Sequence, residues 1–218
     1  RNYNVFFVSN ATDLDINATV VPGFQQMYSQ SFPIFISKLP RTVGYTGAGG
    51  LVGVGTLDIF GNIVTSITLQ PFPGFTGEVR VATFDLNGDG VVDIIAGVGP
   101  GGGPRVRILD GRTGAALNDF FAFEADFTGG VYVAAGDLNG DGVPEVVIGA
   151  GEGGGPRYKV YDNLAANVLY DGFAYEPTSR TGVRVAVGDF NGNGIGDLFV
   201  AAGVGGGPRV RVFDGTRL

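Results

Sequence analysis

The chain contains neither cysteine nor histidine. The absence of cysteine excludes disulfide bonds, thiol catalysis and zinc sites built from thiolates. The absence of histidine removes the commonest general base and one of the commonest metal ligands. Any catalysis or metal binding by this chain would have to use other side chains.

Positive charge and long apolar runs are also scarce. The sequence has 14 Lys and Arg residues against 21 Asp and Glu, a formal net charge of −7. A nucleic-acid-binding protein needs a basic face, so this balance argues against nucleic acid as a partner. No run of about 18 apolar residues occurs, and we expect no insertion into a membrane. The chain starts at Arg1 without a signal peptide, which favours a processed product or an excised domain.

Glycine and apolar residues are abundant, and they recur at a fixed step. The sequence has 40 glycines, 17 phenylalanines and 44% hydrophobic residues, enough material for one folded domain over residues 1–218. A motif repeats every 52 residues, as the equivalent residues show: Asp85, Asp137 and Asp189, and then Pro104, Pro156 and Pro208. A period of about 50 residues is typical of solenoids, propellers and arrays.

Each repeat contains four short segments rich in Val, Ile, Phe or Tyr and bounded by turn residues, which predict strands. In the first clear repeat they are Val79–Phe84, Val91–Val98, Pro104–Leu109 and Leu117–Glu124. No segment has a sustained helical period. The sequence therefore predicts an all-β fold, a β-propeller of four-stranded antiparallel blades.

The repeat count predicts four blades. Residues 27–78 form a degenerate repeat without the acidic loop, residues 79–130 and 131–182 form complete ones, and residues 183–218 stop before an outer strand. Because Pro22-Gly23-Phe24 resembles Pro73-Gly74-Phe75, we expect residues 1–26 to supply that outer strand and close the ring. The alternative is a fragment of a larger ring, with edges prone to aggregation.

Acidic loops follow the first strand of each clear repeat. They place oxygen-bearing side chains at loop positions 1, 3, 5 and 9 and a glycine at position 6, which turns the position-7 carbonyl inward. Hard cations such as Ca²⁺ prefer six to eight oxygen ligands of this kind. Position 12 is Ala96, Ile148 or Val200 instead of the Glu of an EF-hand, so the acid at position 9 must complete the site. The predicted ligands of three Ca²⁺ ions are Asp85, Asn87, Asp89, Val91 and Asp93; Asp137, Asn139, Asp141, Val143 and Glu145; and Asp189, Asn191, Asn193, Ile195 and Asp197.

These D-x-N-x-D-G-x-x-D loops, each preceded by an apolar strand and followed by another strand and a Gly-rich turn, resemble the FG-GAP (also called VCBS) repeats of integrin alpha-subunit propellers and many bacterial surface proteins. The resemblance is strong over about residues 79–215 and weak over 27–78. It implies a calcium-stabilised propeller that is secreted or exposed at the cell surface and serves recognition, adhesion or structure. Such propellers commonly have seven blades, whereas this chain has material for four.

Repeated cations follow each Gly-Gly-Gly-Pro turn. Arg105, Arg157 and Arg209 are equivalent, and each is followed two residues later by Arg107, Lys159 or Arg211. Alternation places both members of a pair on one face of a strand. We expect an architectural role, pairing with blade acids such as Asp110, Asp162 and Asp214. The alternative is a ring of cations that recognises carboxylates. Arg80, Tyr132 and Arg184 are equivalent residues of the first strand, expected to face a central channel.

The sequence leaves three functions open. The first is a calcium-binding recognition or adhesion module with a protein or glycan ligand at the cell surface. For this module we expect no nucleic-acid partner, and we favour a monomer. The second is a lectin-like module. The third is a carbohydrate-active enzyme, a glycosidase or polysaccharide lyase, for which Glu124, Asp126 and Glu176 are the candidate acids; glycosidases need two carboxyls about 5–10 Å apart.

Overall fold

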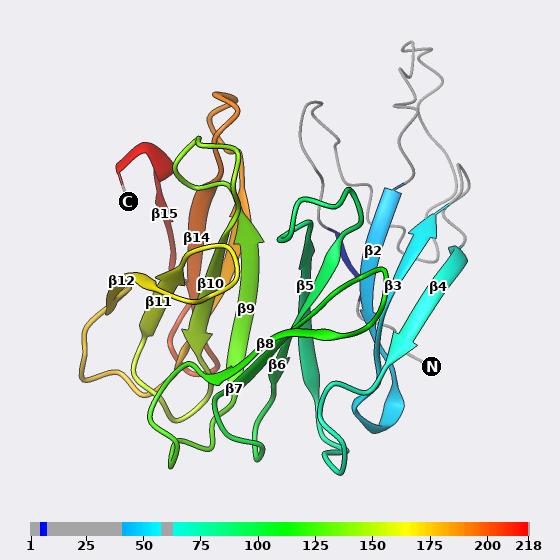
Figure 1. The fold of residues 1–218 in the computed structure, drawn as a ribbon. Helices are drawn as coiled ribbons and strands as arrows, with labels where there is room; N and C mark the ends of the chain where they lie inside the picture. Colours follow the sequence, from blue (N-terminus) through cyan, green and yellow to red (C-terminus); the bar gives the residue numbers. More distant parts are fainter. Residues whose placement is uncertain (1–4, 8–40, 58–62, 218) are drawn as a thin grey trace, which may run out of the picture.

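The computed structural model describes residues 5–7, 41–57 and 63–217 and consists of antiparallel sheets placed side by side (Figure 1). Four sheets are formed, each from strands in chain order. We call them blades 1 to 4. Their strands are β1 (Val5–Phe7), β2 (Arg41–Thr46), β3 (Val52–Leu57) and β4 (Ile63–Leu69); β5 (Val79–Phe84), β6 (Asp93–Val98), β7 (Arg105–Leu109) and β8 (Ala116–Phe121); β9 (Val131–Gly136), β10 (Glu145–Ala150), β11 (Arg157–Tyr161) and β12 (Val168–Phe173); and β13 (Val183–Gly188), β14 (Asp197–Ala202) and β15 (Val210–Phe213).

The all-β, blade-based fold predicted from the sequence is confirmed. The described helical residues are two short 3₁₀ turns, η1 (Ala48–Gly50) and η2 (Gly215–Arg217). Within the described part of the chain, no helix is long and apolar enough to cross a membrane. The 52-residue step appears as equivalent strands in blades 2, 3 and 4, so each repeat is one structural unit.

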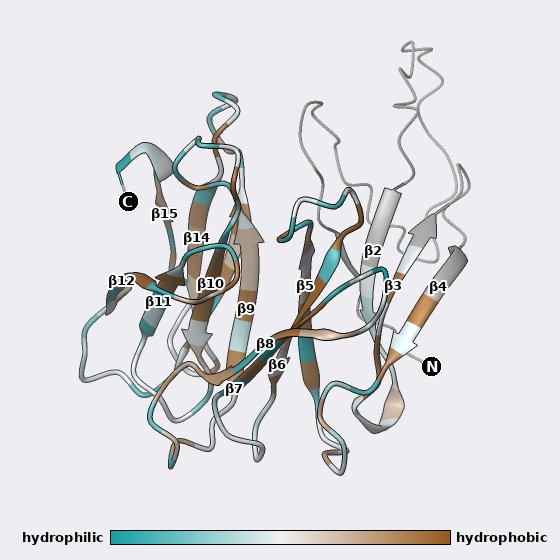
Figure 2. Cartoon of the chain, viewed as in Figure 1, coloured by the Kyte–Doolittle hydropathy of each residue, from teal (hydrophilic) through white to brown (hydrophobic). Residues whose placement is uncertain are grey.

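The core lies between neighbouring blades. The second strands β6 and β10 are buried along their whole length, which explains their uninterrupted apolar runs. Figure 2 shows hydrophobic residues along strands such as β10 and β14 and hydrophilic residues along the connecting loops. The blades approach closely at Gly97, where an added Cβ would lie 2.8 Å from a methyl group of Val131 in the next blade. A side chain at this position would push blades 2 and 3 apart.

The first strands of successive blades contact one another, β5 with β9 and β9 with β13, while the outer strands lie away from these contacts. The outer strands β8 and β12 are largely exposed. This arrangement is that of propeller blades, in which the first strand is innermost.

The described N-terminal strand belongs to blade 1. Of residues 1–26 the structure describes only Val5–Phe7, and these pair with β2 as the first strand of blade 1, with Phe6 opposite Gly44. In blade 2 the residue in this position is Arg80, opposite Gly97. The described part of the N-terminal segment therefore forms the first strand of blade 1. The rest of residues 1–26, from which we expect the outer strand of the last repeat, lies outside the described residues, as does the segment before Arg41 in which the degenerate repeat lacks an acidic loop.

Candidate functional site

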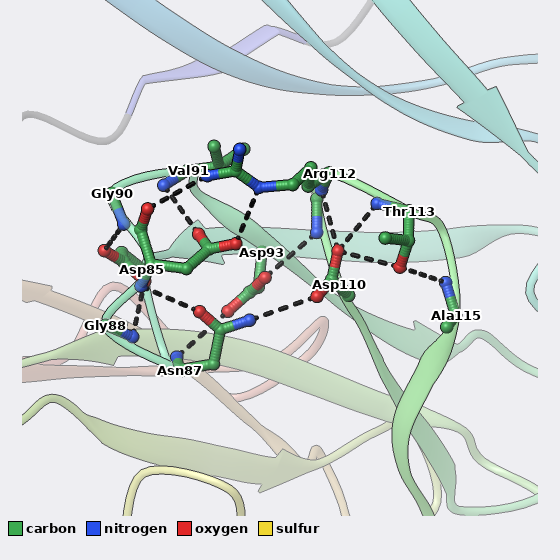
Figure 3. Close-up of polar contacts among 12 residues, drawn as sticks. Asp85, Asn87, Gly88, Gly90, Val91, Asp93, Asp110, Arg112, Thr113 and Ala115 are labelled. Carbon is green, nitrogen blue, oxygen red and sulfur yellow. Dashed lines mark hydrogen bonds and ion pairs between the residues drawn. The ribbon is translucent and has the colours of Figure 1, made fainter.

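The first acidic loop connects β5 to β6 and is held by its own main-chain N–H groups (Figure 3). Asp85 Oδ1 accepts from Gly88 N at 2.8 Å and Asp89 N at 3.2 Å, and its Oδ2 accepts from Gly90 N at 2.8 Å. Asn87 Oδ1 accepts from Asp89 N at 3.0 Å, and Asp89 Oδ1 accepts from Val91 N at 2.9 Å. The backbone thus wraps around the oxygens of positions 1, 3 and 5.

Glycine makes this wrapping possible. Gly90 has a φ of 81°, in the left-handed region that other residues rarely adopt. The equivalent Gly142 and Gly194 have φ values of 83° and 85°. The same backbone turn is therefore built in three blades, as the repeated glycine predicted.

The second and third loops repeat this framework. Asp137 accepts from Gly140 N at 2.6 Å and Gly142 N at 2.9 Å. Asp189 accepts from Gly192 N at 2.7 Å and Gly194 N at 2.8 Å. The position-5 side chains Asp141 and Asn193 accept from the position-7 N–H groups, at 2.7 and 2.8 Å.

The acid at position 9 also accepts hydrogen bonds from the main chain, a role that the sequence did not predict. Asp93 is fully buried, and its Oδ2 accepts from Leu86 N at 2.9 Å and Asn87 N at 3.2 Å, while its Oδ1 accepts from Gly111 N at 2.9 Å. It thereby ties the loop to the turn between β7 and β8. Asp197 does the same in blade 4, accepting from Phe190 N at 2.9 Å and Gly215 N at 3.1 Å.

Electrostatic repulsion acts on these acids. Burial raises the pKa of the Asp93 carboxyl although main-chain N–H groups stabilise its charge. Burial also raises the pKa of Glu145, and the nearby carboxylates of Asp141 and Asp137 raise it further. A cation at this loop would reduce that repulsion, and the donors are the hard oxygens that Ca²⁺ prefers. The residues present fit such an ion.

The carboxylates are nevertheless spread around each loop. Among the described residues, no three His, Cys, Asp or Glu side chains form a compact metal-binding group. The expected ligand set mixes two or three carboxylates per loop with an Asn side chain and a main-chain carbonyl. Oxygen atoms that already accept an N–H keep a further lone pair for an ion.

The repeated cations pair with blade acids, but with other acids than those expected. Arg105 pairs with Asp119 and Arg157 with Asp171, each through two hydrogen bonds of 2.7 Å. Asp110, the expected partner, instead accepts from Thr113. The reason is strand register, because the outer strand places its acid directly opposite the second cation of the pair.

The equivalent residues of the first strands form a stack. The Arg80 guanidinium lies 3.6 Å from the ring centroid of Tyr132, and that of Arg184 lies 5.4 Å from the same ring. Glu152 accepts from Tyr132 Oη at 2.7 Å and from Arg80 Nη2 at 3.3 Å. This network links the inner strands of blades 2, 3 and 4.

A cavity of about 460 Å³ lies between blades 2 and 3, among the Gly-rich and connecting turns. Aromatic rings and charged groups of both signs line it: Phe123, Phe127, Phe173, Arg157, Arg180, Glu124 and Asp126. Glu124 and Asp126 were candidate acids in the sequence, but the sequence did not predict that Arg180 lies near them. One feature of the sequence could have indicated Arg180: it interrupts the repeat, because the equivalent residue 52 positions earlier is Thr128.

Residues 85–148 match the family model of the FG-GAP-like repeat. Among solved structures, the chain is similar to exotype rhamnogalacturonan lyase YesX, with 17% identity over 80% of this chain and 37% of that one and a TM-score of 0.47. It is also similar to the Dos1 propeller, with 15% identity over 81% of this chain and 43% of that one and a TM-score of 0.48. The chain thus spans less than half the length of either protein. The family match covers the first and second acidic loops, and the four antiparallel sheets in which this unit recurs are those of an all-β, propeller-type fold.

Proposed function

We propose that this chain is a calcium-binding recognition or adhesion module that acts outside the cell or at its surface. The observation that carries the proposal is the acidic loop, built three times with the same hydrogen bonds and the same glycine turn. A polar framework reproduced in three blades, with oxygens at the same positions, suits one kind of hard cation.

The residues that would hold the ions are the fifteen loop residues predicted from the sequence. When bound, Ca²⁺ would supply positive charge at the loop between the first and second strands of blades 2, 3 and 4. Three ions would change the formal charge from −7 to −1 (−7 + 6). The buried Asp93, Glu145 and Asp197 link each loop to its blade, so ion binding would stabilise the blade itself.

A carbohydrate ligand is the second candidate, favoured by the cavity between blades 2 and 3. Its volume of about 460 Å³ is in the range of small-molecule sites. The Phe173 side chain is 47% exposed at its edge, and an aromatic face can cover the apolar face of a sugar ring. Arg180 donates to the carbonyls of Pro177 and Ser179 and, among the described residues, to no carboxylate. Glu124 and Asp126 could accept hydrogen bonds from hydroxyl groups.

Binding fits this cavity better than glycoside hydrolysis. A glycosidase needs one carboxyl kept protonated by a raised pKa. The pKa of Glu124 is instead lowered, by its own main-chain N–H and by the Arg157 guanidinium. The pKa of Glu176 is lowered chiefly by its hydrogen bond from Arg209. Both acids are therefore ionised near neutral pH.

Calorimetric titration with CaCl₂ tests the calcium proposal. We expect binding that Asp137→Ala weakens, while Asp126→Ala, an exposed acid outside the loops, leaves it unchanged. A glycan array read with calcium and with chelator tests the carbohydrate proposal, with Phe173→Ala as the cavity variant. No heat of calcium binding would contradict the first proposal, and glycan signals indifferent to Phe173→Ala would contradict the second.

A further inference from the structure

The cavity of about 460 Å³ is formed between two four-stranded blades, 2 and 3. Its lining residues come from the segments 123–127, 150–157 and 173–180, which the structure describes throughout. The chemistry of the cavity therefore follows from two complete repeats.

Two charged residues of this cavity depart from the 52-residue repeat. Phe173 is repeated as Phe121 of blade 2. By contrast, the residues one step before Asp126 and Arg180 are a glycine and a threonine. Side chains present in every repeat serve the scaffold that the repeats share. Asp126 and Arg180 are not part of that shared scaffold, and both line the same cavity.

The second cation of the cavity, Arg157, is already engaged. It donates to both carboxylate oxygens of Asp171 at 2.7 Å and to Glu124 Oε1 at 2.8 Å. Its guanidinium carbon also lies 5.7 Å from the ring centroid of Phe123. Arg157 therefore joins blade 3 to blade 2, and a ligand would have to displace these partners in order to bind it.

Arg180 presents one edge of its guanidinium without a protein partner. Its Nη1 donates to the carbonyl oxygens of Pro177 at 2.7 Å and Ser179 at 2.8 Å, which hold the group on its own turn. That turn is tied to the Gly-rich turn of blade 3, since Gly153 N donates to the Arg180 carbonyl oxygen at 3.2 Å. Among the described residues, Nε and Nη2 of Arg180 have no hydrogen-bond partner. These two groups form an edge that matches the two oxygens of a carboxylate.

An aromatic ring and two carboxyl groups complete the lining. Phe173 is 47% exposed, and its ring packs on Gly155, where an added Cβ would lie 3.2 Å from the Cε1 atom of the ring. Asp126 accepts no hydrogen bond from any described residue, and Glu124 keeps acceptor sites beyond its bond from Arg157. An aromatic ring can lie against the apolar face of a sugar, and carboxylates accept hydrogen bonds from hydroxyl groups.

We propose that this cavity binds a hexuronic acid residue of an acidic glycan, with the sugar carboxylate on Nε and Nη2 of Arg180 and the apolar face of the ring on Phe173. The inference rests on the carbohydrate candidate proposed for this cavity, and it specifies the class of sugar. A hexuronic acid carries on one ring the features that suit this lining: a carboxylate, an apolar face and hydroxyl donors.

The two acids of the cavity fix the orientation of the sugar. A carboxylate placed beside Glu124 or Asp126 would meet a like charge, whereas the sugar hydroxyls can donate to both acids. The sugar carboxylate is therefore directed to Arg180. A neutral hexose would leave the open edge of Arg180 without an anion, and an amino sugar would place a second cation beside it.

Calorimetric titration with matched oligosaccharides tests the inference. The probes are trimers of galacturonic, glucuronic and mannuronic acid, and the same trimers after reduction of each carboxyl to a CH₂OH group. A constant CaCl₂ concentration keeps any calcium bound by the loops the same in every titration. We expect at least one acidic trimer to bind about tenfold more tightly than its reduced form. Arg180→Ala should remove this difference by weakening the binding of the acidic trimer alone.

Phe173→Ala should weaken the binding of both forms, because it removes the surface under the ring. The matched control is Phe121→Ala, since Phe121 is the equivalent residue of blade 2 and is 55% exposed; its loss should change neither dissociation constant. Equal binding of acidic and reduced trimers, or an equal loss of both in Arg180→Ala, would overturn the acidic-sugar assignment and leave the carbohydrate proposal standing. Binding of no trimer would overturn both.

Peptides that end in phenylalanine with a free carboxylate are the remaining probe, because they also combine an apolar ring with an anion. We expect them to bind more weakly than the acidic trimer, since they lack its hydroxyl donors. Binding of these peptides alone, lost in Arg180→Ala, would overturn the glycan assignment and indicate a protein partner instead.

Discussion

Arg112 donates from Nε to Oδ2 of Asp89 at 3.0 Å and from Nη2 to the Asp89 carbonyl oxygen at 3.0 Å. The first acidic loop therefore has a guanidinium on its position-5 carboxylate. The residues one and two steps later are Leu164 and Thr216, so the other two loops have no charge at this position. Three loops with nearly the same sequence thus differ in their electrostatic surroundings.

Removing this guanidinium should strengthen calcium binding at the first loop. Arg112→Ala takes a positive charge away from Asp89, and we expect the affinity of that loop to rise by about tenfold. Calorimetry with CaCl₂ measures the change, and Arg180→Ala, on a turn outside the loops, is the control for net charge. Equal affinities in Arg112→Ala and the unmodified chain would show that the ion does not approach Asp89.

The third loop should release its ion before the second loop. Asn193 stands where the second loop has Asp141, and neither loop has a guanidinium like that of Arg112, so the third site differs by having one carboxylate fewer. Stepwise addition of chelator, followed by NMR signals of the loop glycines, should show Gly194 changing at a higher free calcium than Gly142. Asn193→Asp should move that transition to lower calcium, by about tenfold in affinity. Simultaneous release from the second and third loops would contradict this order.

The bidentate pair between Arg157 and Asp171 should stabilise blade 3. Arg157→Ala loses both 2.7 Å bonds to Asp171 and the 2.8 Å bond to Glu124, and we expect the free energy of unfolding to fall by about 1 kcal/mol. Urea denaturation measures the loss. Arg209→Ala is the matched comparison, because Arg209 pairs with Glu176 but, among the described residues, with no outer-strand acid, and its loss should be smaller.

The same pair gives a pH dependence. The hydrogen bond from Arg157 holds the pKa of Asp171 below its ordinary value of 3.8, which approximates the unfolded state. The stabilisation is fully present above pH 3.8 and is lost as the pH falls through the lower folded-state pKa. Unfolding free energies of the unmodified chain and of Asp171→Asn should therefore converge as the pH is lowered from 5 to 2. A constant difference over that range would contradict the assignment.

The buried acid of the first loop should matter for stability even without calcium. Asp93→Ala removes the acceptor of three main-chain N–H groups, those of Leu86, Asn87 and Gly111. Because these groups lie in or beside the core, we expect a loss of roughly 3 kcal/mol in the presence of chelator. Thermal unfolding measures it, with the exposed Asp126→Ala as the control. A loss seen only with calcium present would mean that Asp93 acts through the ion alone.

Local patterns in the sequence determined the strands and loops. The prediction of Val79–Phe84 coincides with β5, and the other three predicted strands of that repeat differ from β6, β7 and β8 by one to three residues at their ends. These features could be predicted because turn residues and short β-branched runs act within a few neighbours. The loop hydrogen bonds are equally local, joining Asp85 to residues three to five positions away.

Only the tertiary structure decided which distant residues meet. Pairing with β8 gave Arg105 the partner Asp119 instead of Asp110, because strand register selects between acids that the sequence makes equivalent. Packing between blades buried Val106 and left Val210 exposed, although the two occupy the same position of the repeat. Whether such a residue is buried depends on the sheet packed against it. The repeat has nearly the same sequence with or without that sheet, so the sequence alone does not predict the burial.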